Sequence, residues 1–595
     1  MLHRHYESEL RYLRDGGGAF AEAHPEQARA LRLDAIEDRD PYVERLLEGV
    51  AFLSARVQER LDDDLPEYTQ RLVGLLYPHF LTPFPSCCIV EMTPRPGLVL
   101  KTATVPRGTE LLTAPVGPER VALRFQTAQD VRVHPMALTS VDLGYGADGT
   151  SSVRLVFTLT AGATLGAVDL ASLRLYLHAE ASVASTAHLL LTRHVTRIEA
   201  RVAGGTAAGA LSPRPGADGP PLVTLRGPAA VRPAGIDPAE ALLPHGDALP
   251  SGLRLLQEWL LFRRKFWQVD VVGLAPLAQA APDAEQFAID LHFDRPYPEN
   301  RRLLAEHVRL NVTPAVNLFA HDAEPVRAEH TWSEQRVIPS LRHAASIEGY
   351  DVTAVTAVED GTGRRRPYAR SFGLAADAER SFDVLRRPGV RPAADLYLLL
   401  ASAELDAGVA TTETLSVGMR CTNGALPYDL LQPGMVNLLA PGAPQTVSVA
   451  NLDRPSLVRR PPLERHPDLL WALLAHWSFS HGSVATTEAL TGLLDLYDWA
   501  DTEASRGRRR GVRAVRWAPK EVLRRGAVRR GVEVTVEITE GSFADAGDLA
   551  LFGLVLSEFL SLYATLNAFV HLVIETVPTG ARMTWEPDRG ARPLV

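Results

Sequence analysis

The feature that most constrains the fold is an apolar stripe near the start of the chain. Residues three or four apart share one face of a helix, so apolar residues at that spacing form a continuous apolar face. Other helices, from this chain or from partner chains, must cover such a face. The stripe therefore predicts a helical bundle segment, and its members are Val43, Leu46, Leu47, Val50, Leu53, Val57 and Leu61.

A second helix is expected before the striped one, because Tyr6, Leu10 and Leu13 have helical spacing. The striped helix itself is expected to begin near residue 40, because Asp40 and Pro41 suit its N-cap and first turn.

The stretch "DDDLPE" (62–67) predicts that the striped helix ends and a third helix begins, because it fits a capping box with Pro66 in the first turn. Three adjacent carboxylates, Asp62 to Asp64, could instead bind Ca²⁺ or Mg²⁺ through oxygen. The alternating Asp/Asn and Gly pattern of a calcium loop is absent, so capping and solvation are the favoured interpretation.

After residue 85 the pattern changes to short β-branched segments separated by Gly and Pro. The last segment alternates strand, helix and strand, which is typical of a small α/β unit. A chain of 595 residues is too long for one hydrophobic core. We therefore predict a multidomain α+β protein: N-terminal helices (1–85), a first β-rich domain (86–225), a second β-rich wing domain (226–430) and a C-terminal α/β domain (431–595).

Charge and cysteine content exclude several classes of protein. The net charge of −9 disfavours a general nucleic-acid binder. Three cysteines in this spacing match neither a disulfide framework nor a zinc site, so a reducing compartment is expected.

The start of the chain lacks the apolar core of a signal peptide. The most apolar run, 549–570, contains Glu558 and Asn567, and we expect a buried or interface helix there instead of a membrane span.

No motif assembles into a catalytic site. "GYGADG" (144–149) has the spelling of a dinucleotide motif, but a strand pattern follows where that motif needs a helix, so a hairpin loop is expected. His476 and His481 are five residues apart, which suits a shared metal poorly. Cys87 and Cys88 are expected to be buried thiols and not a redox pair. We predict no catalytic, cofactor-binding or metal-binding residues and no enzymatic activity; the competing hypothesis is a β-rich hydrolase.

Arginine is concentrated near the C-terminus, in 506–517 and 524–531. This pattern favours a solvated β-hairpin or an acidic protein partner over a nucleic-acid site.

Several long stretches resemble the TssF (VasA/ImpG) family of type VI secretion baseplate subunits. They include "YESELRYLRDGGGAFAEAHPE", "DPYVERLLEGVAFLSARVQERLDDDLPEYTQRLVGLLYPHFLTPFPS", "LQEWLLFRRKFWQVDVVGL", "NVTPAVNLF" and "FGLVLSEFLSLYATLNAFVHLVIET", and they recur along most of the chain. The resemblance implies a structural role without cofactors. Two such chains would join one TssG-like subunit in a wedge, related to the wedge of contractile phage tails.

The resemblance also implies the wider assembly. Wedges would associate with a TssK-like adaptor and a TssE-like sheath initiator, surround the spike and seed the contractile sheath. The chain would be cytoplasmic and recruited to the secretion complex anchored in the inner membrane, with no membrane insertion and no nucleic acid. The alternative is a wedge subunit of a phage tail, a tailocin or an extracellular injection system.

The predicted partner interface combines the helical stripe with the stretch that leaves it. Pro78, Pro83 and Pro85 fix φ and make this exit from the bundle stiff. The candidate interface residues are Tyr6, Leu10, Leu13, Val43, Leu46, Leu47, Val50, Leu53, Val57, Leu61, Tyr77, Pro78, Pro83 and Pro85.

Overall fold

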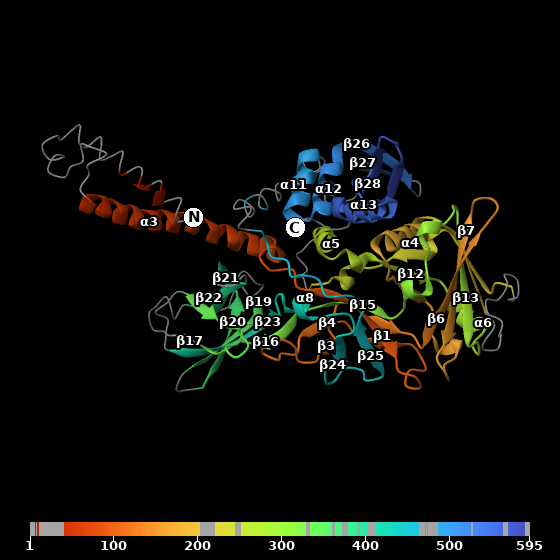
Figure 1. The fold of residues 1–595 in the computed structure, drawn as a ribbon, viewed down its shortest axis with the longest axis horizontal. Coiled ribbons are helices and arrows are strands. Elements are labelled where there is room, and N and C mark those ends of the chain that lie inside the picture. The colour runs from red at the N-terminus through yellow and green to blue at the C-terminus, as the bar shows by residue number, and fades with distance from the viewer. Residues whose placement is uncertain are drawn as a thin grey trace. The chain divides into compact units, whose positions relative to one another are not determined.

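The structure is a computed structural model, shown in Figure 1. It describes residues 6–7, 9–10, 13, 41–202, 220–243, 251–328, 334–359, 363–371, 379–389, 393–402, 412–462, 471, 473, 486–524, 527–562 and 569–589. The chain forms two units: one contains Met1–Pro78 and Pro467–Ala475, and the other contains His79–His466 and His476–Val595.

The first unit is dominated by one helix, α3 (Pro41–Leu76), of 36 residues. The predicted break at the Asp triad is wrong, because α3 continues through residues 62–66. The physical reason lies in the apolar period. Leu61 and Leu65 are four residues apart, and Leu72 and Leu76 follow in the same helical phase, so the amphipathic pattern outweighs the capping signal.

The second unit begins with the turn η1 (Pro78–Phe80) and a six-stranded sheet. This sheet has the order β24 (Val436–Leu439), β3 (Glu110–Thr113), β4 (Arg124–Thr127), β15 (Val312–Val316), β1 (Cys87–Pro94) and β25 (Val447–Asn451). Its neighbours β2 (Ala103–Val105) and β5 (Val131–Val133) pair separately. A core of buried residues, including Cys88, Val90 and Phe125, packs along the sheet.

Two sheets and three helices form the next part of this unit. A five-stranded sheet has the order β10 (Val223–Arg226), β9 (Val195–Val202), β13 (Gln286–Phe293), β7 (Ser151–Leu159) and β6 (Met136–Tyr145). A four-stranded sheet has the order β11 (Val231–Pro233), β12 (Gln268–Val272), β8 (Ser172–Leu177) and β14 (Val308–Arg309). The helices are α4 (Ala181–Arg193), α5 (Ser251–Leu261) and α6 (Ala275–Ala280). Single 3₁₀ turns complete the part: η2 (Leu165–Ala167), η3 (Pro228–Ala230), η4 (Pro238–Glu240), η5 (Arg263–Phe266), η6 (Glu299–Arg301) and η7 (Ala305–His307).

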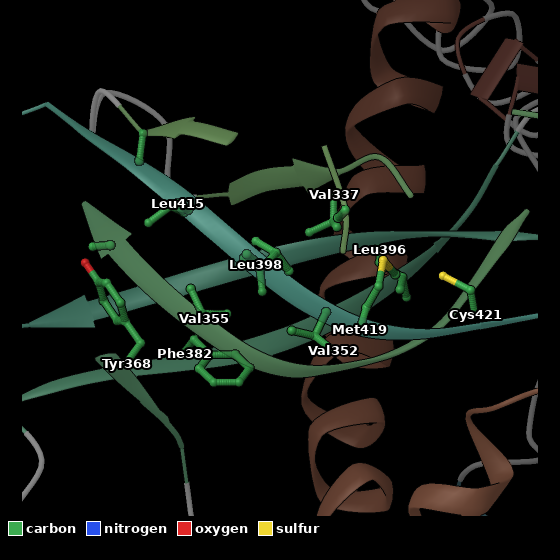
Figure 2. Close-up of a cluster of buried hydrophobic side chains, with 14 of the residues drawn as sticks. Val337, Val352, Val355, Tyr368, Phe382, Leu396, Leu398, Leu415, Met419 and Cys421 are labelled. Carbon is green, nitrogen blue, oxygen red and sulfur yellow. The ribbon is translucent and has the colours of Figure 1, made fainter. Parts of the chain in front are cut away.

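An eight-stranded sheet packs on a hydrophobic core of its own. Its order is β16 (Phe319–Asp322), β23 (Glu413–Thr422), β19 (Glu348–Glu359), β20 (Arg365–Arg370), β21 (Arg380–Pro388), β22 (Ala394–Ser402) and β18 (Glu334–Val337), with β17 (Val326–Ala328) also on β23. Figure 2 shows the core, where Val352, Phe382, Leu398 and Met419 point toward one another from different strands. The short helix α8 (Leu426–Leu430) follows this sheet.

The C-terminal part contains helices and a four-stranded sheet. The helices are α11 (Thr487–Tyr497), α12 (Glu503–Gly511) and α13 (Ala546–Ser561), and the strands are β26 (Val512–Arg524), β27 (Ala527–Thr539), β28 (Phe569–Val577) and β29 (Arg582–Arg589). β27 and β28 are parallel and are connected through α13, while β26 and β29 are antiparallel to their neighbours.

Several sequence predictions can now be judged. The chain is rich in strands, with helices in smaller number, as expected. "GYGADG" is the loop of the antiparallel β6–β7 hairpin, and this prediction is confirmed. The predicted Arg-rich hairpin is confirmed for β26 and β27, but residues 503–511 form helix α12. The predicted loop at 204–221 falls almost entirely outside the described residues, and so do His476 and His481.

The four-part division of the chain stays a prediction. Its boundary between residues 225 and 226 falls inside β10, and the six-stranded sheet combines strands from all three segments after residue 85. The positions at which the sequence pattern changes therefore do not coincide with the boundaries between groups of paired strands.

Candidate partner-binding surfaces

Helix α3 has an exposed apolar face. Tyr42 is 86% exposed, Leu46 69% and Leu53 62%, with Val50 also exposed. These four residues recur at intervals of three or four and so occupy one side of the helix. Ala51 and Ala55, half a turn away, are fully buried. An isolated soluble chain rarely exposes such a contiguous apolar face, so the face indicates a surface that something else covers.

The exposed face contains Gly49, and a Cβ built there would meet nothing within 4 Å. Arg45 and Arg56 flank the face and are exposed. The combination of an apolar centre with charged flanks is typical of protein–protein interfaces.

The other predicted interface residues have different surroundings. Tyr6, Leu10 and Leu13 are helical and half-buried, as is Leu47 in α3. Val43, Val57 and Leu61 lie in α3, but their side chains are outside the described part. Tyr77 and Pro85 are buried within the chain, Pro83 is half-buried and Pro78 is exposed. Burial raises the pKa of Tyr77 to about 12.

The stretch from His79 to Ser86 is held at several points inside the second unit. The Phe80 ring lies edge-on to Tyr497 of α11, with centroids 4.6 Å apart, and to Trp499 at 5.5 Å. The Tyr497 hydroxyl lies 3.5 Å from Nε2 of His79. Edge-to-face aromatic pairs add about 0.5–1.5 kcal/mol beyond their buried area.

Backbone bonds hold the second half of this stretch. The Phe84 N–H donates to the Arg459 carbonyl at 2.7 Å, and the Arg459 N–H donates back at 2.9 Å. The Ser456 hydroxyl accepts from the Cys87 N–H at 2.9 Å. Segments far apart in sequence therefore hold the residues that follow α3, and this stretch is the anchored start of the second unit.

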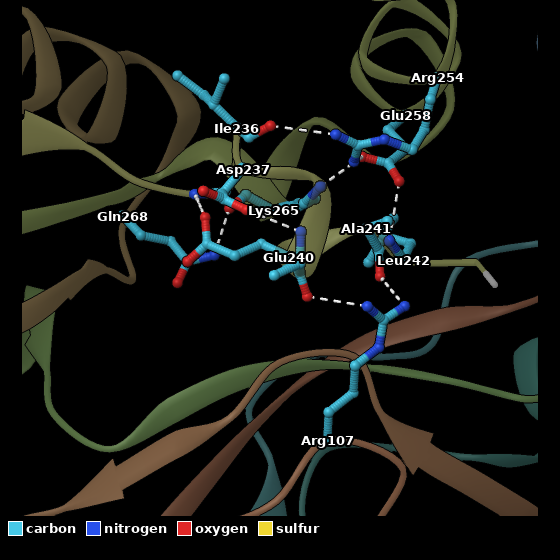
Figure 3. A network of polar contacts seen from close by, with 12 residues as sticks. Arg107, Ile236, Asp237, Glu240, Ala241, Leu242, Arg254, Glu258, Lys265 and Gln268 are labelled. Carbon is cyan, nitrogen blue, oxygen red and sulfur yellow. Dashed lines mark hydrogen bonds and ion pairs between the residues drawn. The ribbon is translucent and has the colours of Figure 1, made fainter. Parts of the chain in front are cut away.

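A buried polar network lies between α5 and the loop before it (Figure 3). The carboxylate of Glu258 accepts from Lys265 Nζ, from Arg254 at 3.1 Å and from the Leu242 N–H at 2.8 Å. Burial opposes ionisation of Glu258, but Lys265 and Arg254 outweigh it, and the pKa of the carboxyl lies below its ordinary value. Burial lowers the pKa of Lys265 to about 8.

Arg107 reaches the same loop from the turn before β3. Its guanidinium donates to the carbonyls of Ala239 and Ala241, both at 2.8 Å. Together with the Glu258 contact to Leu242, this fixes the loop from two sides (Figure 3).

Two carboxylates attach α13 to α4, to the turns η5 and η6 and to α12. Asp545 caps α13, accepting from the Asp548 N–H at 2.7 Å, and also accepts from Ser185 of α4 and from Arg301, each at 2.8 Å. Asp548 accepts from Arg263 at 2.9 Å and from Arg508 at 3.2 Å. The C-terminal helix is therefore joined to the preceding part by charge-assisted hydrogen bonds.

Sequence patterns did not reveal these ionic contacts. A charged residue inside an apolar run, as in "LLQEWLL" (255–261), was the available signal for Glu258. Asp545, immediately before an apolar helix, has the position of an N-cap. Neither signal predicts which residue the carboxylate will contact.

The three cysteines are poorly suited to act as nucleophiles. Cys87, Cys88 and Cys421 are free and buried. Burial raises the pKa of all three thiols and so disfavours the reactive thiolate. The prediction of buried thiols at 87 and 88 is confirmed. Within the described ranges, no group of three or more His, Cys, Asp or Glu side chains is placed to hold a metal ion.

The helix suspected near 549–570 is α13, which is largely buried. Across the part of the chain that the structure describes, no helix is both long and apolar enough to cross a membrane.

Comparison with known proteins identifies the family. The family model described as "Type VI secretion system, TssF" matches residues 1–592. This chain belongs to the TssF family. The resemblance found in the sequence is confirmed, and the family is a structural component of the type VI secretion baseplate.

Relatives match over nearly their whole length. The type VI secretion system component TssF1 of Pseudomonas aeruginosa is 28% identical, with 100% of this chain and 99% of the relative covered. A chain in the TssK-TssF-TssG baseplate subcomplex, solved by cryo-electron microscopy, is 31% identical with a TM-score of 0.75, covering 92% of this chain and 99% of that one. A chain in a type VI baseplate complex is 28% identical with a TM-score of 0.63, and both chains are fully covered.

Proposed function

We propose that this TssF-family chain is a structural subunit of the baseplate wedge, with two copies joined to one TssG-like subunit. The observation that carries the proposal is the match to a chain solved in a TssK-TssF-TssG subcomplex. The match covers 92% of this chain and 99% of that one. TssG-like and TssK-like proteins are accordingly the proposed partners. The wedge would help seed the contractile sheath, with a TssE-like initiator and the spike.

The exposed face of α3 is the proposed binding surface for the TssG-like subunit and the second copy. Leu46, Val50 and Leu53 would enter a bundle of helices from the three chains, with Tyr6, Leu10 and Leu13 nearby in sequence. Covering a fully exposed Leu contributes about 1.5–3 kcal/mol, so a few such residues supply much of the binding energy. Tyr77 and Pro85, being buried already, would position the helix instead of contacting a partner.

The proline-rich exit from α3 is proposed as a stiff lever. Pro83 and Pro85 restrict φ, and the backbone bonds between Phe84 and Arg459 fix the same stretch. Such a lever could pass a change in the bundle to the second unit during sheath assembly.

A catalytic role is not proposed. The buried thiols are disfavoured as nucleophiles, and the family is structural. The chain would act in the cytoplasm, recruited to the secretion complex at the inner membrane. Membership of the TssF family favours type VI secretion over a phage tail, a tailocin or an extracellular injection system.

Affinity purification of the tagged chain from its native cells, followed by native mass spectrometry, tests the proposal. A species with two copies of this chain and one smaller partner is expected. A stable lone monomer at low salt, with no partner, would contradict the wedge and the proposed interface.

A further inference from the structure

The eight-stranded sheet contains a cluster of three arginines around one carboxylate. Strands β23, β19, β20 and β21 are consecutive in this sheet, and each contributes one member. We call this set the arginine cluster: Arg420, Asp351, Arg370 and Arg386. Nη1 of Arg370 and Nη2 of Arg420 approach the same oxygen, Oδ2 of Asp351, at 3.3 and 3.2 Å. Two guanidinium groups therefore share one acceptor.

The distances in the cluster are long for charge-assisted hydrogen bonds. Such bonds are typically about 2.7–2.9 Å when a guanidinium has a carboxylate of its own. Arg460 provides the comparison on the same strand, because it reaches Glu348 of β19 at 2.6 Å. Asp351 cannot give both of its arginines a contact of that quality, so each of them is only partly satisfied.

The third arginine adds to the positive charge. Arg386 donates to the Tyr350 carbonyl, next to Asp351 in the chain. Burial lowers the pKa of Arg386; Asp351 opposes this effect, while Arg370 and Arg420 add to it. Among the four members of the cluster, three positive charges therefore face one negative charge.

The cluster also has unused donors and an opening to solvent. The Nε of Arg420 is buried, and the described residues provide no acceptor for it. The Arg420 guanidinium lies over the Tyr350 ring, 5.6 Å from its centroid, and this contact orients its plane. The Arg370 side chain is 52% exposed, so a small ion can reach the cluster from water. Each guanidinium has five N–H donors, more than Asp351 can accept.

We propose that the arginine cluster binds one phosphate or sulfate ion, with Arg370 and Arg420 donating to its oxygens beside Asp351. The planar fork of a guanidinium matches two oxygens of such an ion. The ion carries about two negative charges near neutral pH, which would balance the excess in the cluster. A single carboxylate, with one charge, would balance only half of that excess. This proposal goes beyond the wedge function and does not rest on it.

The cluster adjoins the stretch that follows α3. Burial raises the pKa of Tyr350, and a hydrogen bond with the Thr82 side chain opposes this increase. Thr82 lies between Phe80 and Phe84, which other segments of the second unit hold. An ion that orders Arg420 would also restrain Tyr350 beneath it. We therefore expect ion binding to slow amide hydrogen exchange in residues 79–86 as well as in β19.

Thermal unfolding of the purified full chain in sodium phosphate or sodium sulfate tests the proposal. Sodium chloride at equal ionic strength is the reference, and sodium acetate is the probe for a carboxylate. A ligand that binds only the folded chain raises Tm by mass action, so we expect a saturable rise with an apparent Kd of about 1 mM. Chloride and acetate should give a much smaller rise.

Variants of the cluster should change the affinity in opposite directions. Arg370→Gln and Arg420→Gln should each raise the apparent Kd for phosphate about tenfold, because each removes a charged donor. Asp351→Asn should lower it about threefold, because the competing carboxylate is lost. A purely structural role of the cluster predicts no such gain. Arg370 is half-exposed, so its variant remains informative if a change at a more buried member impairs folding.

Two arginines with carboxylates of their own are the matched controls. Arg336 is 54% exposed and pairs with Asp395, and Arg460 is 28% exposed, like Arg420, and pairs with Glu348. Arg336→Gln and Arg460→Gln should retain the response to phosphate.

Three outcomes would overturn the proposal. The first is an equal rise of Tm in chloride or acetate, and the second is an equal loss of the phosphate response in the control variants. The third is a phosphate response that persists unchanged in Arg370→Gln and Arg420→Gln. Native mass spectrometry of the wedge measures a separate property, so failure of this proposal and failure of the wedge can be told apart.

Discussion

Glu258 and Lys265 form an ion pair in which neither side chain is more than 1% exposed (Figure 3). Removing one member of a buried pair leaves an uncompensated charge and costs about 3–5 kcal/mol. We expect Glu258→Gln to lower the unfolding free energy by that amount, because Lys265 and Arg254 lose their shared carboxylate. Denaturant midpoints by tryptophan fluorescence measure it. Glu306→Gln, at a side chain 71% exposed, is the control and should change stability by less than about 0.5 kcal/mol.

Gly547 marks the closest approach of α13 to α4. A Cβ built on Gly547 would lie 2.2 Å from the Ser185 carbonyl oxygen, so Gly547→Ala must push the two helices apart. We expect a loss of about 1–3 kcal/mol in unfolding free energy and faster proteolysis of the C-terminal part. Gly492→Ala in α11 is the matched control, since nothing lies within 4 Å of its Cβ. It should stabilise the protein by up to about 1 kcal/mol, because alanine favours the helix. Equal effects of the two variants would contradict this packing.

His188 in α4 makes stability depend on pH. Burial lowers its pKa from 6.5 to about 4, and the described residues provide no hydrogen-bond partner for its Nε2. Between these pH values the unfolded chain binds the proton more strongly than the folded chain, so stability falls as the pH drops from 6.5 toward 4. We expect His188→Leu to flatten this decline by up to about 3 kcal/mol, at 1.36 kcal/mol for each pKa unit. Thermal unfolding at pH 7, 6, 5 and 4.5 is the measurement, and parallel pH profiles would exclude His188 as a source.

Local sequence patterns predicted the hairpins better than the sheets. "GYGADG" lies between two alternating stretches, so its hairpin depends on near neighbours alone. The six-stranded sheet instead pairs β1 with β15 and β25, more than 200 and 350 residues away. No local pattern encodes such pairings.

The candidate interface residues show the same contrast between what local spacing can predict and what depends on tertiary contacts. Spacing alone was enough to place Leu46, Val50 and Leu53 on one helical face. It could not show that Tyr77 and Pro85 are buried by the chain itself, because that depends on tertiary contacts. The capping signal at Asp64 failed for a related reason: a capping residue favours a helix end, but a continuing apolar period can keep the helix intact.

The prolines after α3 should affect assembly more than binding. Replacing Pro83 and Pro85 by Gly makes the backbone more flexible. We expect it to lower the unfolding free energy by about 0.5–1 kcal/mol for each site. The backbone bonds between Phe84 and Arg459 do not involve the proline nitrogen atoms and can persist. We expect normal copurification with the TssG-like partner but fewer sheaths in cells by fluorescence microscopy. Pro96→Gly with Pro282→Gly, both at exposed positions, is the control. Unchanged secretion in the Pro83 and Pro85 variant would argue against a lever.

The face of α3 provides the most direct test of the wedge interface. Leu46→Asp and Leu53→Asp each place a carboxylate inside the proposed bundle, where water is excluded. Burying an unpaired charge is far more costly than losing one apolar contact. We therefore expect either variant to abolish copurification with the TssG-like subunit, while circular dichroism and thermal unfolding of the isolated chain stay unchanged, because both positions are exposed.

Two leucines elsewhere provide matched controls for this experiment. Leu341 is 68% exposed, like Leu46 at 69%, and Leu98 is 60% exposed, like Leu53 at 62%. Leu341→Asp and Leu98→Asp should leave the complex intact, because both residues belong to the second unit and not to the face of α3. If all four variants bind normally, α3 is not the interface. If all four fail, exposed leucines in general are required, and the specific role of the α3 face is lost.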